Sequence, residues 1–194
     1  MAVERPILYF ADAAEWEAWL VENHDVVDGV RLAIAKKANP VASVTYAGAL
    51  DVALCWGWID GIKHGLDEGY FLQTFVPRRP KSTWSEVNVG KVAALIEAGR
   101  MQPAGQAEID RAKADGRWDA AYGSSKTIAV PPEFEAAMTP AAREFFATLS
   151  SQNRFALLFR LHNVKRAETR TRKIAEYVAM LERGETIYPQ KPGR

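Results

Sequence analysis

Strand-type patterns occur only in the first 76 residues of this chain, and this limits the folds that it can adopt. Short apolar or alternating runs are typical of strands, and they occupy residues 7–10, 30–34, 58–63 and 70–76. These strands are too few and too close together for the alternating strands and helices of a doubly wound nucleotide-binding fold. The pattern therefore predicts a small sheet.

A turn signal separates the last two of these strands. Residues 67–69 read Asp-Glu-Gly, a combination that favours tight turns, so residues 58–63 and 70–76 are expected to pair as an antiparallel hairpin. The segment that follows, residues 77–82, reads Pro-Arg-Arg-Pro-Lys-Ser, and its prolines disfavour regular structure. The hairpin is therefore expected to lead into a basic loop.

Helical patterns account for most of the remaining chain. Asp12 precedes Trp16, Trp19 and Leu20, which recur at helical spacing, so Asp12 is expected to cap a helix whose tryptophans pack in the core. The same reasoning predicts helices after a cap at Ser43 or Thr45, after a cap at Ser82 or Thr83, over residues 104–114, over 132–138, after Thr139, after Ser150 or Ser151, and over 168–183.

The last two helices carry more detailed expectations. The helix that follows Ser150 or Ser151 is expected to carry an apolar stripe of Phe155, Leu158 and Phe159, which His162 continues as a packed or boundary residue. In the next helix, Glu168 and Arg172 lie four residues apart with the acid first, which is the favourable order for an ion pair.

The strands and helices divide the chain into parts of different composition. Residues 1–122 are expected to form a mixed domain, in which helices pack on a small antiparallel sheet. Residues 123–132 contain Gly, Ser and two Pro, so they are interpreted as a linker, and residues 133–194 as an all-helical domain. The predicted fold class is therefore α+β.

Cysteine and histidine are scarce, and this excludes several kinds of site. One cysteine rules out a disulfide framework and any zinc or iron–sulfur site with several cysteines. The three histidines, His24, His64 and His162, are too scattered along the sequence to indicate a metal site. The chain also lacks a Gly-rich phosphate loop and the His-Glu-x-x-His and Gly-x-Ser-x-Gly motifs. Neither a metal nor a cofactor is expected.

The sequence shows no segment of the kind that inserts into a membrane. Spanning a bilayer takes about 20 apolar residues in succession, and no run approaches that length. Charged residues and Pro6 interrupt the apolar residues near the start, unlike in a secretory signal. A cytoplasmic protein without membrane insertion is therefore expected.

The formal net charge of +1 conceals a strong gradient along the chain. Residues 1–70 contain eleven acidic and five basic residues, whereas residues 154–194 contain four acidic and ten basic residues. The overall balance argues against a general polyanion-binding protein, but it does not exclude a local anion site.

The densest group of functional side chains lies on the expected hairpin and in the stretch after it. It comprises Trp58, Asp60, Lys63, Arg78, Arg79, Trp84 and Asn88. Arginine binds carboxylate or phosphate through paired hydrogen bonds, and tryptophan rings stack on planar ligands. The group is therefore either a cleft for a small anionic or aromatic ligand or a buried network that ties the hairpin to the next helix. In both cases Asp60 is expected close to an Arg or Lys, because buried charges are paired.

Two other interpretations use different residues. Asp60 and His64 are an even number of residues apart in a strand and would share a face, so Asp60 with His64, or Asp60 with Lys63, is a candidate general acid–base pair. The basic residues between 165 and 173 form either a solvated helix face or a surface that contacts nucleic-acid phosphates.

Four segments together resemble the YdeI/OmpD-associated family, which is also described as bacteriocin-protection. They are Ala-Leu-Cys-Trp-Gly-Trp-Ile-Asp-Gly at 53–61, Phe-Val-Pro-Arg-Arg-Pro-Lys-Ser-x-Trp-Ser-x-x-Asn at 75–88, Gly-Arg-Trp-Asp-Ala-Ala-Tyr at 116–122, and Lys-x-x-Glu-Thr-Arg-x-Arg-Lys-Ile at 165–174. The resemblance implies a small bacterial protein linked to tolerance of antimicrobial peptides or envelope stress. It brings no catalytic residues with it.

The residues and the resemblance together favour a non-enzymatic stress or bacteriocin-tolerance protein. Its expected partner is a small anionic or aromatic ligand, or another protein, bound by the seven residues of the hairpin group. A small enzyme and a nucleic-acid-associated protein are the alternatives.

Overall fold

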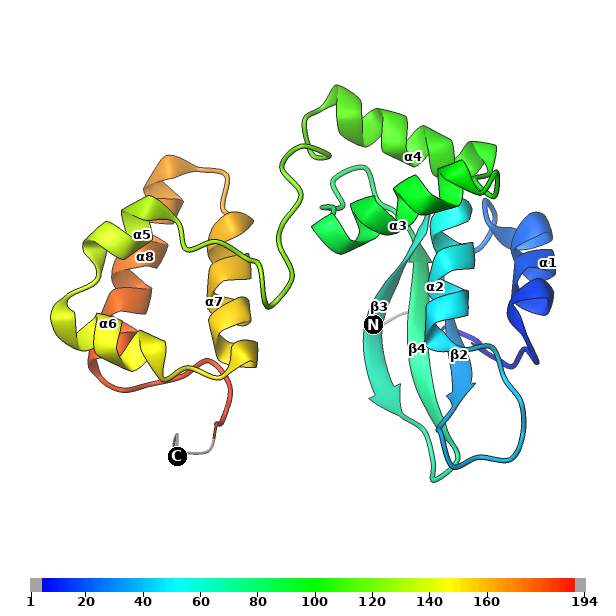
Figure 1. The fold of residues 1–194 in the computed structure, drawn as a ribbon, viewed down its shortest axis with the longest axis horizontal. Coiled ribbons are helices and arrows are strands. Elements are labelled where there is room, and N and C mark those ends of the chain that lie inside the picture. The colour runs from blue at the N-terminus through cyan, green and yellow to red at the C-terminus, as the bar shows by residue number, and fades with distance from the viewer. Residues whose placement is uncertain (1–4, 191–194) are drawn as a thin grey trace. The chain divides into compact units, whose positions relative to one another are not determined.

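The computed structural model describes residues 5–190 and confirms an α+β fold with a helical C-terminal part (Figure 1). The elements are β1 (Ile7–Leu8), α1 (Ala13–Asn23), β2 (Val30–Ala35), α2 (Tyr46–Cys55), β3 (Trp58–Gly65), β4 (Tyr70–Pro77), α3 (Glu86–Glu97), α4 (Pro103–Ala114), α5 (Pro132–Ala137), α6 (Pro140–Ala147), α7 (Ser151–His162) and α8 (Ala167–Glu182). The chain forms two compact units. The first runs to Trp84 and continues over Asn88–Ala120, and the second contains Ser85–Val87 and the chain from Ala121 onward.

The sheet of the first unit has the strand order β1-β2-β4-β3. Strands β3 and β4 form the expected antiparallel hairpin, β4 also pairs antiparallel with β2, and the two-residue β1 joins β2 in parallel. The register of the hairpin shifts once, because Asp60 is opposite Phe75 whereas Lys63 is opposite Gln73. Three steps along β3 thus match two along β4, which is a β-bulge in the edge strand.

Helices α1 and α2 cover the face of the sheet that carries Trp58 and Phe75. Trp16 of α1 is fully buried, and its ring centroid lies 6.1 Å from that of Trp58 and 5.9 Å from that of Phe75. Its indole nitrogen donates to the carbonyl of Ala49 in α2, at 3.1 Å. The expectation that the tryptophans of α1 pack in the core is confirmed for Trp16, while Trp19 stacks on it at the edge and stays partly exposed.

Local capping signals locate most helix starts correctly but fail at α3. Asp12 accepts hydrogen bonds from two backbone N–H groups of α1, and Thr45 accepts one from α2, as expected. Helix α3, however, begins at Glu86 and not after Ser82 or Thr83. The hydroxyl of Ser82 accepts from the Arg79 backbone N–H upstream, at 3.0 Å, so it does not cap a helix downstream.

Cys55 is the last residue of α2 and lies in the core, where its thiol makes the stability of the folded protein depend on pH. Burial raises the pKa of its thiol to about 11, whereas an exposed thiol ionises near ~8.5. The folded state therefore keeps the thiol protonated over a wider pH range than the unfolded state does. The resulting contribution to the free energy of unfolding is fully present below pH ~8.5 and is lost as the pH rises toward 11. Between these two pH values, the free energy of unfolding of the wild type should fall by about 1.4 kcal/mol more per pH unit than that of Cys55→Ala. Urea denaturation of both at pH 8 and 10 measures this, and equal losses would contradict it.

The second unit is built around α8. This helix contacts α5, α6 and α7, and Ile174, Tyr177 and Leu181 on its buried face join the core. The other core residues are Ile128, Phe134, Met138, Ala142, Phe146, Leu157, Leu158 and Leu161. This arrangement agrees with the predicted helical C-terminal part.

The expected apolar stripe on α7 is confirmed, whereas an expectation about α8 is wrong. Leu158 is buried in the core together with Leu157 and Leu161, Phe155 and Phe159 are partly buried and pack against this core, and His162 is partly buried. In α8, Arg172 lies 3.7 Å from Glu176 rather than beside Glu168, and Lys173 donates to the same carboxylate at 2.6 Å. These pairs neutralise part of the basic surface that the nucleic-acid interpretation requires. Among residues 5–190, no helix combines the length and apolar character needed to cross a membrane.

Candidate ligand-binding site

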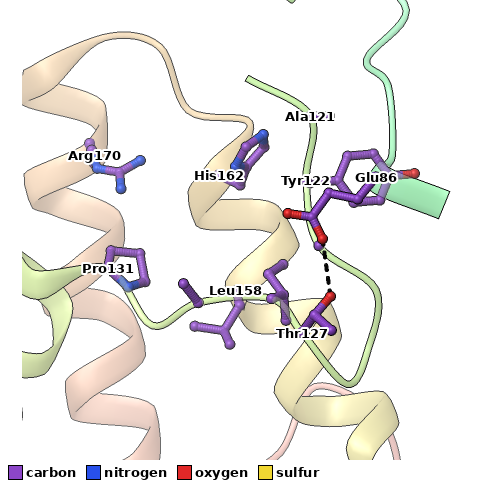
Figure 2. A pocket seen from close by; sticks show the side chains of 11 residues that line it. Glu86, Ala121, Tyr122, Thr127, Pro131, Leu158, His162 and Arg170 are labelled. Carbon is purple, nitrogen blue, oxygen red and sulfur yellow. Dashed lines mark hydrogen bonds between the residues drawn. The ribbon is translucent and has the colours of Figure 1, made fainter. Parts of the chain in front are cut away.

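The second unit contains a pocket of about 220 Å³, which is lined by Glu86, by the segment 121–131 and by residues of α7 and α8 (Figure 2). We call it the tyrosine pocket. It is lined by Glu86, Ala121, Tyr122, Gly123, Thr127, Ile128, Ala129, Pro131, Leu158, His162 and Arg170.

Tyr122 forms one wall and is held by its backbone and by its ring. Its carbonyl accepts from the Glu86 backbone N–H at 2.9 Å, next to a parallel bridge between Ser85 and Tyr122. Its ring meets Phe159 edge to face, with centroids 4.7 Å apart, and lies 6.0 Å from the ring of His162. Phe155 and Phe159 of α7 thus pack against the ring of Tyr122 as well as against the core of the second unit.

Glu86 brings a carboxylate to the pocket. The Thr127 hydroxyl donates to it at 3.2 Å, and the same hydroxyl accepts from the Ser124 backbone N–H at 2.9 Å (Figure 2). Both contacts depend on a compact turn, in which the Ser124 carbonyl accepts from the N–H groups of Thr127 and Ile128. The Glu86 carboxylate is exposed to solvent, and it has no basic side chain as an ion-pair partner within residues 5–190.

Arg170 closes the opposite side of the pocket and is already engaged. Its guanidinium donates to Glu133 at 2.6 Å and to the carbonyl of Leu161, at the end of α7, also at 2.6 Å. A backbone hydrogen bond at Glu133, together with the hydrogen bond from the guanidinium of Arg170, lowers the pKa of the Glu133 carboxyl. Arg170 therefore joins α5 to the C-terminal end of α7, and its charge is balanced within the protein.

The pocket combines an aromatic ring, apolar walls and one accessible carboxylate. Ile128, Pro131 and Leu158 supply the apolar surface, and Glu86 can accept a hydrogen bond from a ligand. Such a lining suits a ligand with a planar apolar body and a cationic or N–H donor end. Residues 5–190 contain no cluster of three or more His, Cys, Asp or Glu side chains that could hold a metal.

The sequence carried only indirect signals for this pocket. Tyr122 and Arg170 stand in two of the segments that support the family resemblance, 116–122 and 165–174, and Glu86 stands in a third, 75–88. Nothing in their spacing shows that they meet, because the pocket forms only when α7 and α8 pack.

The structure disperses the seven residues of the hairpin group. Trp58 is 1% exposed, and its indole nitrogen donates to the carbonyl of His24 at 3.0 Å. Trp84 is also buried, and the guanidinium of Arg78 stacks 3.5 Å from its ring centroid. Asn88 is buried near the start of α3. The structure therefore brings Arg78 and Trp84 together and buries Trp58 elsewhere.

Arg78 and Arg79 contribute to a separate pocket in the first unit. It measures about 240 Å³, and its lining residues are Arg5, Asp28, Val76, Pro77, Arg78, Arg79 and Pro80. Arg79 is exposed, while Arg78 donates to the Thr83 carbonyl at 3.2 Å. Three arginines and one aspartate make this arginine pocket a candidate anion site.

Asp60 has a different partner from the one that the sequence indicates. Its carboxylate accepts a 2.8 Å hydrogen bond from the Tyr46 hydroxyl, and within residues 5–190 it forms no ion pair with an Arg or Lys. The expected Asp60–Arg or Asp60–Lys contact is therefore wrong. Burial and the neighbouring Asp60 carboxylate together raise the pKa of the Tyr46 phenol.

The bulge in β3 also changes which residues share a face. Asp60 and Lys63 are opposite Phe75 and Gln73, which point to one side of the sheet, whereas His64 is opposite Leu72, which points to the other. The expectation that Asp60 and His64 face the same side is therefore wrong. An uninterrupted strand would have alternated as predicted, and the extra residue reverses the alternation.

Two family models match the chain. Residues 8–108 match one described as Domain of unknown function (DUF8412), and residues 127–184 match one described as Bacteriocin-protection, YdeI or OmpD-Associated. No curated protein and no solved structure matches. The resemblance inferred from the sequence is thus confirmed for the C-terminal part.

The two matches divide the four segments that carry the resemblance. The segment at 165–174 lies inside the bacteriocin-protection match, whereas those at 53–61 and 75–88 lie inside the other match and 116–122 lies between the two. The match over residues 8–108 covers more than half of the chain. The chain therefore belongs to the family Domain of unknown function (DUF8412), and its residues 127–184 are similar to the family described as Bacteriocin-protection, YdeI or OmpD-Associated.

Proposed function

We propose that this chain is a bacteriocin-protection protein that acts by binding a small aromatic ligand in the tyrosine pocket, without transforming it. The match over residues 127–184 indicates a function related to bacteriocin protection in general. The observation that carries the finer proposal is that seven of the eleven residues lining the pocket come from the matched segment. The matched domain thus contributes most of this pocket.

The size and charge of the pocket define the ligand more closely. A pocket of about 220 Å³ is smaller than the usual range of about 300–1,000 Å³ for drug-sized molecules, so the ligand is small. The Tyr122 ring and the apolar walls favour a planar body. Because the guanidinium of Arg170 is already paired with Glu133, the carboxylate of Glu86 is the charged group that remains for the ligand. A cationic end is therefore favoured over an anionic one.

Benzylamine and benzoate test this proposal, because they share a ring and differ in charge. We expect benzylamine to shift the NMR signals of Tyr122 and Thr127 in the full chain and to bind about tenfold more tightly than benzoate. Glu86→Gln keeps an oxygen that can accept from Thr127 but removes the charge, so it should weaken benzylamine about tenfold. This corresponds to about 1.4 kcal/mol, within the range for a hydrogen bond to a charged group.

Glu144→Gln is the matched control. Glu144 is an exposed residue of α6 in the same unit and does not line the pocket, so its substitution changes the net charge equally and should leave binding unchanged. Equal weakening by both substitutions, or tighter binding of benzoate, would contradict the proposed ligand class.

An anionic ligand in the arginine pocket is the second candidate. The convergence of Arg5, Arg78 and Arg79 on one pocket favours it. Arg79→Ala is the suitable variant, because Arg79 is exposed whereas Arg78 packs on Trp84. If this pocket carries the function, Arg79→Ala should abolish protection while Glu86→Gln leaves it intact.

A further inference from the structure

A third pocket, at the turn end of the hairpin, is lined by four basic residues, a glycine and a phenylalanine. We call it the lysine pocket. It measures about 610 Å³ and is lined by Lys36, Lys37, Lys63, His64, Gly65 and Phe71. Lys36 and Lys37 directly follow β2, while Lys63, His64 and Gly65 end β3. Because β4 lies between β2 and β3, the two basic segments flank Phe71 from either side.

The basic character of this pocket contrasts with the part of the chain that contains it. Residues 1–70 have only five basic side chains against eleven acidic ones, yet three of those five, Lys36, Lys37 and Lys63, line this one pocket. None of its lining residues is acidic. Within residues 5–190, none of the three lysines forms an ion pair with a carboxylate.

Local hydrogen bonds hold the carboxylate of the hairpin turn against the backbone, and within residues 5–190 it forms no ion pair with these lysines. Asp67 lies in the hairpin turn, and its carboxylate accepts from the backbone N–H groups of Gly69 and Tyr70, at 2.8 and 2.7 Å. Lys36 instead donates to the backbone carbonyl of Asp67, at 2.6 Å. The Asp67 carboxylate is thus engaged by the backbone of its own turn and forms no ion pair with Lys36.

The floor of the pocket is aromatic and open. Gly65 is the cross-strand partner of Phe71, and a Cβ at Gly65 would meet no atom within 4 Å. The ammonium group of Lys63 lies 3.9 Å from the Phe71 ring centroid, a cation–π contact that holds the lysine over the floor. Lys63 is exposed to solvent, and this contact orients its ammonium group over the ring.

We propose that the lysine pocket binds a compact phosphorylated anion that carries two or more negative charges. Three ammonium groups without carboxylate partners favour several negative charges, and lysine binds phosphate as a point charge. The excess of acidic over basic residues in residues 1–70 favours a compact anion, because it disfavours an extended polyanion such as nucleic acid. This site is separate from the tyrosine pocket, and neither depends on the other.

Inorganic pyrophosphate is the probe, titrated calorimetrically into the full chain at low salt. We expect one site per chain, and about tenfold weaker binding when NaCl is raised from 50 to 200 mM. Lys63→Glu should weaken binding at least tenfold. Lys126→Glu, which makes the same charge change at an exposed residue of the second unit, should leave it within twofold. Gly65→Val keeps every charge but projects a side chain from the open position, so it should also weaken binding.

Three results would overturn the proposal. They are no binding of pyrophosphate at 50 mM NaCl, equal weakening by Lys63→Glu and Lys126→Glu, and loss of binding in Arg79→Ala with retention in Lys63→Glu, which would move the site to the arginine pocket. Binding of a single-stranded oligonucleotide as tightly as pyrophosphate would contradict the compact ligand. A circular dichroism spectrum for each variant separates loss of binding from loss of fold.

Discussion

Trp16→Ala is expected to lower the free energy of unfolding of the first unit by about 3–5 kcal/mol. Trp16 is fully buried and contacts the rings of Phe10, Trp19 and Phe75. Truncation removes this apolar contact area, leaves a cavity between α1 and the sheet, and leaves the Ala49 carbonyl without its indole donor. Few single changes in this chain should cost as much.

Tryptophan fluorescence during urea denaturation measures this effect selectively. All six tryptophans lie in the first unit, so five remain in the variant to report its unfolding. Val26→Ala is the control, because Val26 is 73% exposed and its truncation should change the stability by less than ~0.5 kcal/mol. A cost below about 1 kcal/mol for Trp16→Ala would show that this ring is not central to the core.

The same substitution, glycine to alanine, is expected to have opposite effects in α3 and α4. Gly105 of α4 packs against the end of α2, where an added Cβ would overlap the Cys55 carbonyl group and lie 2.6 Å from the Met101 sulfur. Gly105→Ala should therefore destabilise the first unit by about 1–3 kcal/mol. Gly90 of α3 has open space at its Cβ position, so Gly90→Ala should stabilise by about 0.5–1 kcal/mol through helix propensity.

The contrast in sign makes this pair informative. Helix propensity alone predicts that alanine increases the stability at both positions. At Gly105 the close approach of α4 to Cys55 reverses this effect. Urea denaturation monitored by tryptophan fluorescence serves for both variants. A gain in stability for Gly105→Ala would show that α4 lies farther from α2 than the structure indicates.

Local sequence signals predicted the elements of the fold because short-range interactions decide them. The caps Asp12, Thr45, Thr139 and Ser150 each accept a hydrogen bond from their own helix, so each marks a start. The start of α3 was misplaced because the hydroxyl of Ser82 serves the loop before it.

The errors that affect the candidate sites come from tertiary context. The β3 bulge turns His64 away from Asp60, and Gly61 within the strand is the kind of signal that accompanies a bulge. Periodicity alone could not show that Tyr122 packs against the aromatic side chains of α7, because Tyr122 lies outside that helix. The tyrosine pocket joins residues from 86 to 170, so no local pattern could have identified it.

Survival of bacteriocin-treated cells that express variants of this chain tests the central claim most directly, because it connects the tyrosine pocket to protection. We predict that wild type, Glu144→Gln and Arg79→Ala protect equally, and that Glu86→Gln lowers survival at least tenfold at equal protein levels. Full protection by Glu86→Gln, together with its loss in Arg79→Ala, would contradict the claim and assign the function to the arginine pocket.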